Sequence, residues 1–424
     1  MFDMELLRGH LREVAERLAR RSFKLDASRI ESLEERRVAM QALADQVQVA
    51  RNTRSELIRQ ARARGQDVTL AMAEIDSLGE QLNAARIELV GIQAELDRIL
   101  LTIPNLPDAS VPQGSGEDGN IEMRRWGAPR QFDFEIKDYA ELGERCGGMD
   151  FEAAARLSGA NFSVLRGHIA HLHRSLVQFM LDLHTAGHGY KEVYVPYLLQ
   201  ASAMQAVGHF TDEEDHFLIK RESERNLYLV PSLEASLSNL VAGQILDGTA
   251  LPQKFVAHGP CFVSKVSTSG RDRRGIMRQR QFDEVAIVQI VEPSTSMQAL
   301  EEMTVCAERV LQLLQLPYRV MNLCCGELGF SAVKTYRLEV WMPSKCQHLE
   351  VGTCSISGDL NARRMQTRWR DPETGKAELV HTLSGSGLAV GVTLAAILEN
   401  YQEADGSIKV PVVLESYMRE YGTR

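Results

Sequence analysis

Five arginines stand within ten positions of one segment, and an aromatic residue follows the last of them after one intervening position. They are Arg271, Arg273, Arg274, Arg278 and Arg280, followed by Phe282. A planar guanidinium forms two parallel hydrogen bonds with phosphate oxygens, and an aromatic ring stacks on a nucleobase. The segment therefore predicts a site for a nucleotide or a nucleic acid. An exposed basic loop that binds nothing is the alternative.

The histidines are a weaker signal. Five of them lie close together in the sequence, at His168, His171, His173, His184 and His188. No carboxylate follows them at a spacing typical of metal ligands, so we expect core or solvent-facing side chains and predict no metal site.

A long helical hairpin is the first element that must position such residues. From Val68 to Ile99, apolar residues recur with alternating gaps of three and four positions, which is typical of a coiled-coil seam. Gly65 marks a turn before this seam, and Asp67 is a candidate N-cap. Less regular apolar series precede the turn, at Leu33, Met40 and Val47 and at Leu43, Ala50 and Leu57. We expect two antiparallel helices of about 35 residues, roughly 50 Å long.

Basic residues gather toward the tip of this hairpin: Arg51, Arg54, Arg59, Arg62 and Arg64. Ion pairs with the more acidic second helix are one interpretation, and a surface that binds phosphates is the other. The net charge of −9 gives no general attraction to nucleic acid, so such a contact must be local.

A change in composition separates this hairpin from the rest of the chain. Residues 102–120 hold three prolines and three glycines. We therefore expect an N-terminal helical domain at 1–103 with its arm at about 27–101, a linker at 104–120, and a second domain at 121–424. In the second domain, amphipathic helices at about 164–187 and 295–316 accompany clustered strands, which favours an α+β fold with an antiparallel sheet flanked by helices. The candidate strands are 193–197, 227–230, 255–257, 286–291 and 338–342.

Composition excludes several classes of protein. The 424 residues are 44% hydrophobic and 25% charged, which is ordinary for a globular protein. Seven cysteines without a CxxC pair predict neither a disulfide framework nor a zinc site. No apolar run is long enough for a membrane span, and the N-terminal residues are amphipathic rather than those of a signal peptide, so we expect a cytoplasmic protein without a membrane partner.

Taken in order, several stretches resemble seryl-tRNA synthetases, which are class II aminoacyl-tRNA synthetases, over essentially the whole chain. Besides the hairpin, the stretches that carry the resemblance include MFDMELLRGHLREVAERLARRSFKLD, HGYKEVYVPYLL, PCFVSKVSTSGRDRRGIMRQRQFDEV and HTLSGSGLAVGVTLAAILENYQEADGSIKVP. The resemblance implies an arm that binds the long variable region of serine tRNA, a catalytic sheet of six or seven antiparallel strands, and a homodimer around Pro196. It also implies ATP and Mg²⁺ as cofactors of serine activation.

The resemblance further assigns residues to two pockets. In the ATP pocket it implies Arg278, Phe282 as the adenine platform, Glu350 as the acid for Mg²⁺ and ATP, and Thr353. In the amino-acid pocket it implies Glu234 and Ser386, and Ser232 stands where the family has threonine.

Among the positions that depart from the family pattern, five bear most directly on the chemistry. Arginines that grip phosphate are replaced by Val263 and Val392, an acid by Lys265, the serine-binding glutamate by Ala286 and an asparagine by Ser384. Losing two guanidiniums and a carboxylate removes roughly 8–10 kcal/mol of transition-state stabilisation. We therefore predict a non-charging paralogue that keeps the dimeric fold and a tRNA surface. The alternative is an active serine–tRNA ligase with compensating groups, or a related ligase with altered amino-acid specificity.

Overall fold

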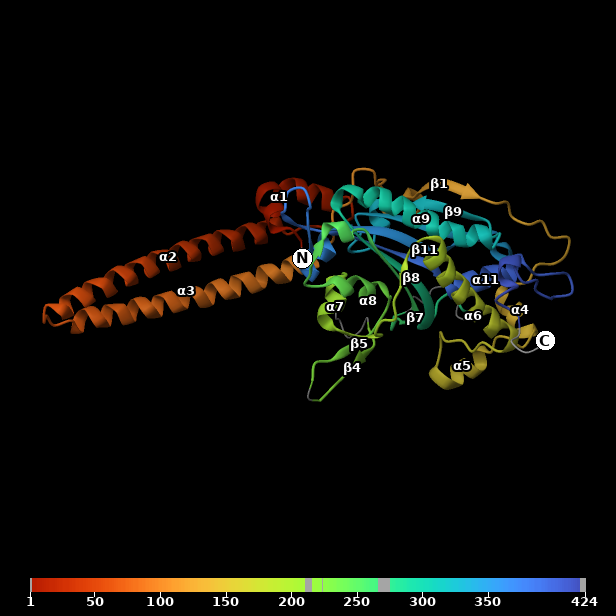
Figure 1. Ribbon diagram of the computed structural model, residues 1–424, viewed down its shortest axis with the longest axis horizontal. Coiled ribbons are helices and arrows are strands. Elements are labelled where there is room, and N and C mark those ends of the chain that lie inside the picture. Colours follow the sequence, from red (N-terminus) through yellow and green to blue (C-terminus); the bar gives the residue numbers. More distant parts are fainter. Residues whose placement is uncertain (1, 210–215, 223, 266–274, 420–424) are drawn as a thin grey trace. The chain divides into compact units, whose positions relative to one another are not determined.

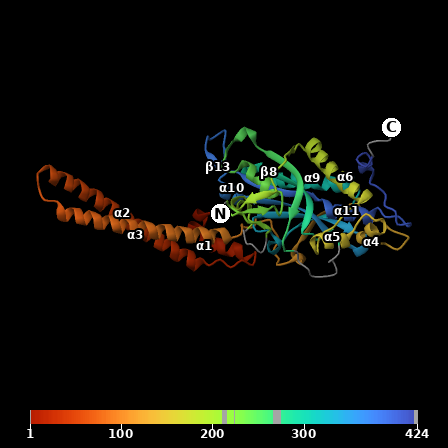
Figure 2. The same cartoon turned by 90° about the horizontal axis from the view of Figure 1, so that it is seen from below.

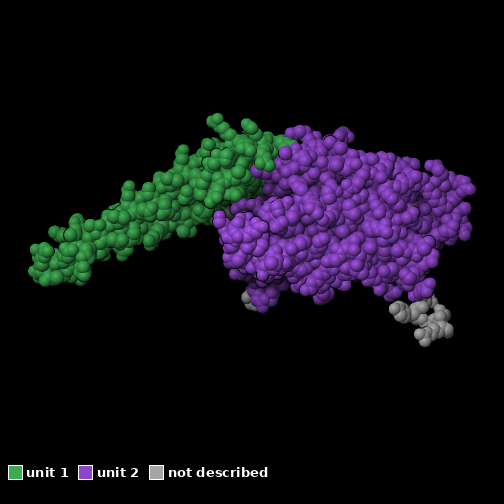
Figure 3. Space-filling model, turned by 45° about the horizontal axis from the view of Figure 1, so that its top comes forward, with its two compact units in different colours: residues 1–104 green, residues 105–424 purple. Residues whose placement is uncertain are grey.

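The computed structural model describes residues 2–209, 216–222, 224–265 and 275–419. The chain divides into two compact units, Met1–Pro104 and Asn105–Arg424, which Figure 3 shows in different colours. The first unit consists of α1 (Met4–Ala19), α2 (Ala27–Ala63) and α3 (Thr69–Thr102). Within the described residues, no helix is long and apolar enough to cross a membrane.

Helices α2 and α3 lie side by side along their length, which confirms the predicted antiparallel hairpin (Figures 1 and 2). Gly65 adopts a φ of +75° in the turn, and Oδ1 of Asp67 accepts a hydrogen bond of 2.9 Å from the backbone N–H of Thr69. The seam of α3 is buried at Leu82, Ala85, Ile92 and Leu96.

One of the two weaker apolar series of α2 does not form the seam. Leu43 and Leu57 are 41% and 49% exposed, whereas Ala44, Val47 and Ile58 are buried. Single positions in a short, irregular repeat did not reveal which side of α2 faces α3.

An eight-stranded sheet forms the centre of the second unit, in the order β1-β9-β10-β11-β14-β8-β7-β2. Neighbouring strands are antiparallel except β2, which pairs in parallel with β7. The predicted α+β fold is confirmed, but the predicted number of six or seven strands is wrong because β1 and the short β2 extend the two edges. The strands are β1 (Ile121–Trp126), β2 (Lys191–Glu192), β7 (Gln253–Phe262), β8 (Gln281–Val291), β9 (Tyr318–Asn322), β10 (Lys334–Met342), β11 (Gln347–Gly358) and β14 (His381–Ala389).

Three long helices cover one face of this sheet: α6 (Gly167–Asp182), α9 (Ser296–Leu313) and α11 (Val390–Asn400) (Figure 1). On β8, Val285 and Ile287 pack into the core beneath these helices, while Ala286 and Val288 pack into a separate core on the opposite face. This alternation is the period of two expected for a strand buried on both sides.

Shorter elements surround the opposite face and the ends of the sheet. The helices are α4 (Tyr139–Arg145), α5 (Phe151–Ser158), α7 (Ala201–Ala206), α8 (Glu234–Ser238) and α10 (Leu360–Met365). Two small sheets hold β3 (Leu198–Gln200), β5 (Leu227–Leu229) and β4 (Leu218–Ile219), and β13 (Ala377–Leu379), β12 (Arg368–Arg370) and β6 (Ile245–Asp247).

The second unit begins at Asn105, which is hydrogen-bonded to later segments of the same unit. The backbone N–H of Asn105 donates to the carbonyl of Phe330 over 2.9 Å. Its side-chain amide donates to the carbonyls of Ser331 and Ser357 over 2.9 and 2.7 Å. These bonds fix the loop that carries Phe330 and Ser331, which line the cavity described next.

Candidate active site

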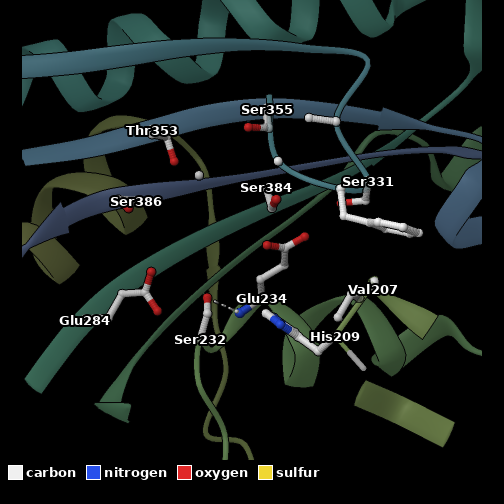
Figure 4. Close-up of a pocket in the computed structure, with 15 residues that line it drawn as sticks. Val207, His209, Ser232, Glu234, Glu284, Ser331, Thr353, Ser355, Ser384 and Ser386 are labelled. Carbon is white, nitrogen blue, oxygen red and sulfur yellow. Dashed lines mark hydrogen bonds between the residues drawn. The ribbon is translucent and has the colours of Figure 1, made fainter. Parts of the chain in front are cut away.

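A cavity of about 310 Å³ opens on the face of the sheet opposite to α6, α9 and α11 (Figure 4). We call it the glutamate cavity because Glu234 and Glu284 are the carboxylates among its described lining residues. Hydroxyl groups make up much of the remaining polar surface. The other lining residues are Val207, Gly208, His209, Ser232, Gly329, Phe330, Ser331, Ala332, Thr353, Ser355, Ser384, Gly385 and Ser386.

Glu234 stands at the first position of α8. Its backbone N–H donates to Oγ of Ser232 over 3.3 Å, and its carboxylate points toward Ser384, with which it shares a hydrogen bond (Figure 4). Burial raises the pKa of Glu234 to about 7, and the nearby charge of Glu284 acts in the same direction. The cavity therefore disfavours a second negative charge and favours a cation.

Glu284 projects from β8 on the side of the cavity nearer to Ser232 (Figure 4). Its Oε2 accepts hydrogen bonds from the backbone N–H of Leu233 over 3.1 Å and from the thiol of Cys261 over 3.3 Å. Burial raises the pKa of Glu284 despite these donors. The carboxylate is thus held in one position by the residue that precedes α8 and by a neighbour on β7 rather than left to rotate.

A second cavity, of about 410 Å³, shares Glu284 and Ser386 with the first. We call it the arginine cavity after Arg278. Lys345 adds a second cationic side chain to its wall. The remaining lining residues are Met277, Phe282, Leu349, Glu350, Val351, Gly352, Ala389 and Val392.

A third cavity, of about 350 Å³, shares Arg278, Phe282 and Val392 with the arginine cavity and adds Val263 and Lys265. The structure therefore brings together the residues that the sequence assigned to an ATP pocket, except Thr353, which lines the glutamate cavity. Val263 and Val392 present no charge there, but Lys265, Arg278 and Lys345 supply three cationic side chains around the joined space.

Glu350 is the one residue that the sequence assigned to Mg²⁺. Its Oε2 lies 3.1 Å from Nε of Arg337, whose NH2 group also donates to Glu327 over 3.0 Å. The described residues contain no group of three or more acidic, histidine or cysteine side chains arranged to hold a metal. Mg²⁺ is commonly bound by one or two carboxylates together with the phosphates of a nucleotide. Glu350 fits an ion of that kind, which a nucleotide brings with it, and Glu284 is the other carboxylate that lines the arginine cavity.

Some predicted residues lie elsewhere. Arg271, Arg273 and Arg274 lie outside the described residues. Pro196 is exposed between β2 and β3, and its carbonyl accepts a hydrogen bond of 2.9 Å from Oγ of Ser236 on α8. This bond ties an exposed edge of the sheet to the helix that carries Glu234.

Several arginines of the hairpin form ion pairs with glutamates of the same hairpin. Ion pairs join the limbs at Arg29–Glu95, Arg36–Glu88 and Arg54–Glu74, and Arg59 pairs with Glu56 on its own helix. A guanidinium nitrogen of Arg62 lies 2.9 Å from Sδ of Met72. Arg54 and Arg59 therefore form ion pairs, and that with Glu74 on the second helix follows the first of the two interpretations. Arg62 and Arg64 remain exposed at the end of α2.

Three titratable residues that line the glutamate or the arginine cavity were not identified as site residues from the sequence: Glu284, His209 and Lys345. Burial beside His216 lowers the pKa of His209 to about 4, so it adds no positive charge to the glutamate cavity near neutral pH. The sequence does contain a pattern from which Glu284 could have been identified. It stands two positions from Ala286, and residues two apart on a strand share a face.

Comparison with known proteins identifies these features. Residues 1–107 match the model of the seryl-tRNA synthetase N-terminal domain, and residues 217–401 match that of the tRNA synthetase class II core domain (G, H, P, S and T). The chain is 63% identical to a serine–tRNA ligase of Pseudomonas putida (strain GB-1) over 419 residues, which cover 99% of this chain and 98% of the relative. It is 60% identical to the serine–tRNA ligase of Ectopseudomonas mendocina over the same shares.

Solved structures agree. The crystal structure of seryl-tRNA synthetase from Pyrococcus horikoshii complexed with ATP superposes with a TM-score of 0.91 at 31% identity, covering 99% of this chain and 98% of that one. The cytoplasmic serine–tRNA ligase of Naegleria fowleri, at 23% identity and a TM-score of 0.88, shares the fold.

These relatives contradict the prediction of a non-charging paralogue. Identity of 63% over the full length to a serine–tRNA ligase supports the alternative, an active ligase. The prediction failed because it counted charges position by position. It counted the carboxylate missing at Ala286 but not the one that Glu284 places on the same strand face, and it left out Lys345.

Proposed function

Since the chain belongs to the seryl-tRNA synthetase family, we propose that it is an ATP-dependent serine–tRNA ligase. The carboxylate of serine attacks the α-phosphorus of ATP, which forms seryl-adenylate and releases pyrophosphate. A ribose hydroxyl at the 3′ end of the tRNA then attacks the seryl carbonyl, and AMP leaves. The observation that carries this proposal is the full-length identity of 63% to a serine–tRNA ligase.

The glutamate cavity and the arginine cavity fit the two small substrates. The glutamate cavity, of about 310 Å³, offers carboxylates and hydroxyls that suit the ammonium and hydroxyl groups of serine. The arginine cavity offers Phe282 for stacking on adenine and Arg278 for the phosphates. Glu284 and Ser386 line both cavities, so a bound serine and a bound ATP would meet at these two residues.

Because Val263 and Val392 carry no charge, other cationic side chains must contact the phosphates. Arg278, Lys265 and Lys345 take this part in the proposal, because all three line the cavities that also contain Val263 or Val392. A lysine is a point charge rather than a two-pronged donor, so these contacts fix the phosphates less rigidly than an arginine would. Glu350 would hold a Mg²⁺ ion that arrives with ATP, and the ion would supply further positive charge to the phosphates.

The helical hairpin is the part that binds serine tRNA, through residues toward its tip such as the half-buried Arg51 and the exposed Arg62 and Arg64. The enzyme works as a homodimer in the cytoplasm, with Pro196 in the region where two copies meet. Tyr194 and Leu198, which are 87% and 42% exposed, support this placement because they give the edge beside β2 an apolar surface.

Serine-dependent exchange of pyrophosphate into ATP tests the first step, and charging of serine tRNA with labelled serine tests the second. We expect both activities in the purified full chain, with the Pseudomonas putida enzyme as the positive control. Exchange with another amino acid but not with serine would contradict the proposed substrate. Silence with all twenty amino acids, from protein that still binds ATP, would contradict the proposed function.

A further inference from the structure

We propose that Glu284 binds the α-ammonium group of serine and so performs, from a different strand position, the task that the family resemblance assigns to position 286. This inference rests on the proposed function, since it names the contact that recognises the amino group. It concerns one specificity-determining residue of this chain.

The register of β8 places Glu284 on the same face of the strand as Ala286. Ala286 packs in the core opposite to α6, α9 and α11, and its strand partner on β14 is Ser386. Glu284 lies two residues along the strand, on the same face. That spacing moves the carboxylate by roughly 7 Å, because a strand rises about 3.4 Å per residue. The shift places Glu284 where the glutamate and arginine cavities join.

The charge of the glutamate cavity favours a bound cation. Two carboxylates face the glutamate cavity, and no lysine or arginine is among the described residues that line it. Two carboxylates that share a poorly solvated space are stabilised by a cation between or beside them. In the proposed reaction, the ammonium of serine is the cation that enters this space.

Neutral hydrogen-bond donors fix the position of the Glu284 carboxylate. The N–H of Leu233 and the thiol of Cys261 donate to Oε2, and the hydroxyl of Ser232 also bonds to this carboxylate. A carboxylate fixed in advance by neutral donors keeps its negative charge for the ligand and loses little entropy on binding. An ion pair within the protein would have cancelled that charge.

The test compares L-serine with L-glycerate, which carries a hydroxyl in place of the ammonium. Binding of each to the full chain is measured by titration calorimetry. In Glu284→Gln we expect serine to bind roughly 10- to 100-fold more weakly, because a charge-assisted hydrogen bond is lost. Binding of glycerate and of ATP is expected to stay within a factor of about three. Glu284→Asp, which keeps the charge, is expected to retain part of the preference for serine over glycerate.

Glu378→Gln is the matched control, since Glu378 is an exposed glutamate on the short strand β13. The inference is overturned if folded Glu284→Gln binds serine as tightly as the wild type, or if serine and glycerate weaken equally. It is also overturned if the wild-type protein binds no serine. Serine binding that depends on Glu284, without any pyrophosphate exchange in the wild type, would leave this inference standing and refute the proposed function.

Discussion

The stability of the second unit is expected to fall as the pH rises from about 4.5 to about 7, because of Glu234. Burial raises the pKa of this carboxyl from 4.5 to about 7 in the folded protein. The folded state therefore holds the proton more tightly than the unfolded state does, and unfolding releases it within this window. The stabilisation is complete below pH 4.5 and is lost as the pH passes through the folded-state pKa.

The magnitude follows from the size of the shift. One pKa unit corresponds to about 1.4 kcal/mol, so a shift from 4.5 to about 7 is worth about 3 kcal/mol in total. Between pH 5 and pH 8, where most of the change occurs, we expect about 2–3 kcal/mol. Glu284 also has a raised pKa and contributes a slope of the same sign, so the wild-type curve alone does not isolate Glu234.

The variant Glu234→Gln isolates it. Glutamine does not titrate, so the free energy of unfolding of the variant relative to the wild type is expected to increase by about 2–3 kcal/mol from pH 5 to pH 8. Urea unfolding of the full chain without serine, followed by tryptophan fluorescence, measures this difference. Glu378→Gln serves as the exposed control and is expected to show no such trend. A difference that is flat with pH, or that decreases, would refute the assignment of a raised pKa to Glu234.

Three further outcomes are expected. Arg278→Ala should lower the rate of serine-dependent pyrophosphate exchange by roughly 10²- to 10³-fold while changing serine binding little, and an unchanged rate would remove Arg278 from the phosphate contacts. Leu96→Ala should lower the free energy of unfolding of the hairpin by about 2–5 kcal/mol in thermal unfolding. Ile87→Ala, at a side chain that is 65% exposed, should change this free energy by less than about 0.5 kcal/mol. Equal effects would show that the seam is misplaced. Arg62→Glu should weaken binding of serine tRNA and reduce its salt dependence by about one phosphate contact, and Arg156→Glu in the other unit is the control; equal effects of the two variants would refute a specific role for the tip.

The sequence predicted the elements that are held by apolar side chains. The heptads of α3 and the amphipathic helices near α6 and α9 were found within a few residues. The strands were found only in part: β8 was predicted as 286–291 and runs over Gln281–Val291, and β10 was predicted as 338–342 and runs over Lys334–Met342. The missing halves carry polar residues such as Glu284 and Arg337. A strand that lines a binding site gives up apolar alternation on one face, so the pattern fades where the site begins.

The site itself depends on three-dimensional position more than on motif letters. Ala286 reads as a lost carboxylate when the motif is compared one letter at a time. On the strand, however, Glu284 and Ala286 share a face, and Glu284 places a carboxylate on the wall of the glutamate cavity. Lys345 lies 47 positions before Val392 in the sequence, yet both line the arginine cavity. No local spacing connects Lys345, in the turn between β10 and β11, with Val392 on α11, because these segments meet only in the folded unit. The net charge of a binding site depends on all the side chains that line it, whereas a sequence motif contains only the side chains of one segment.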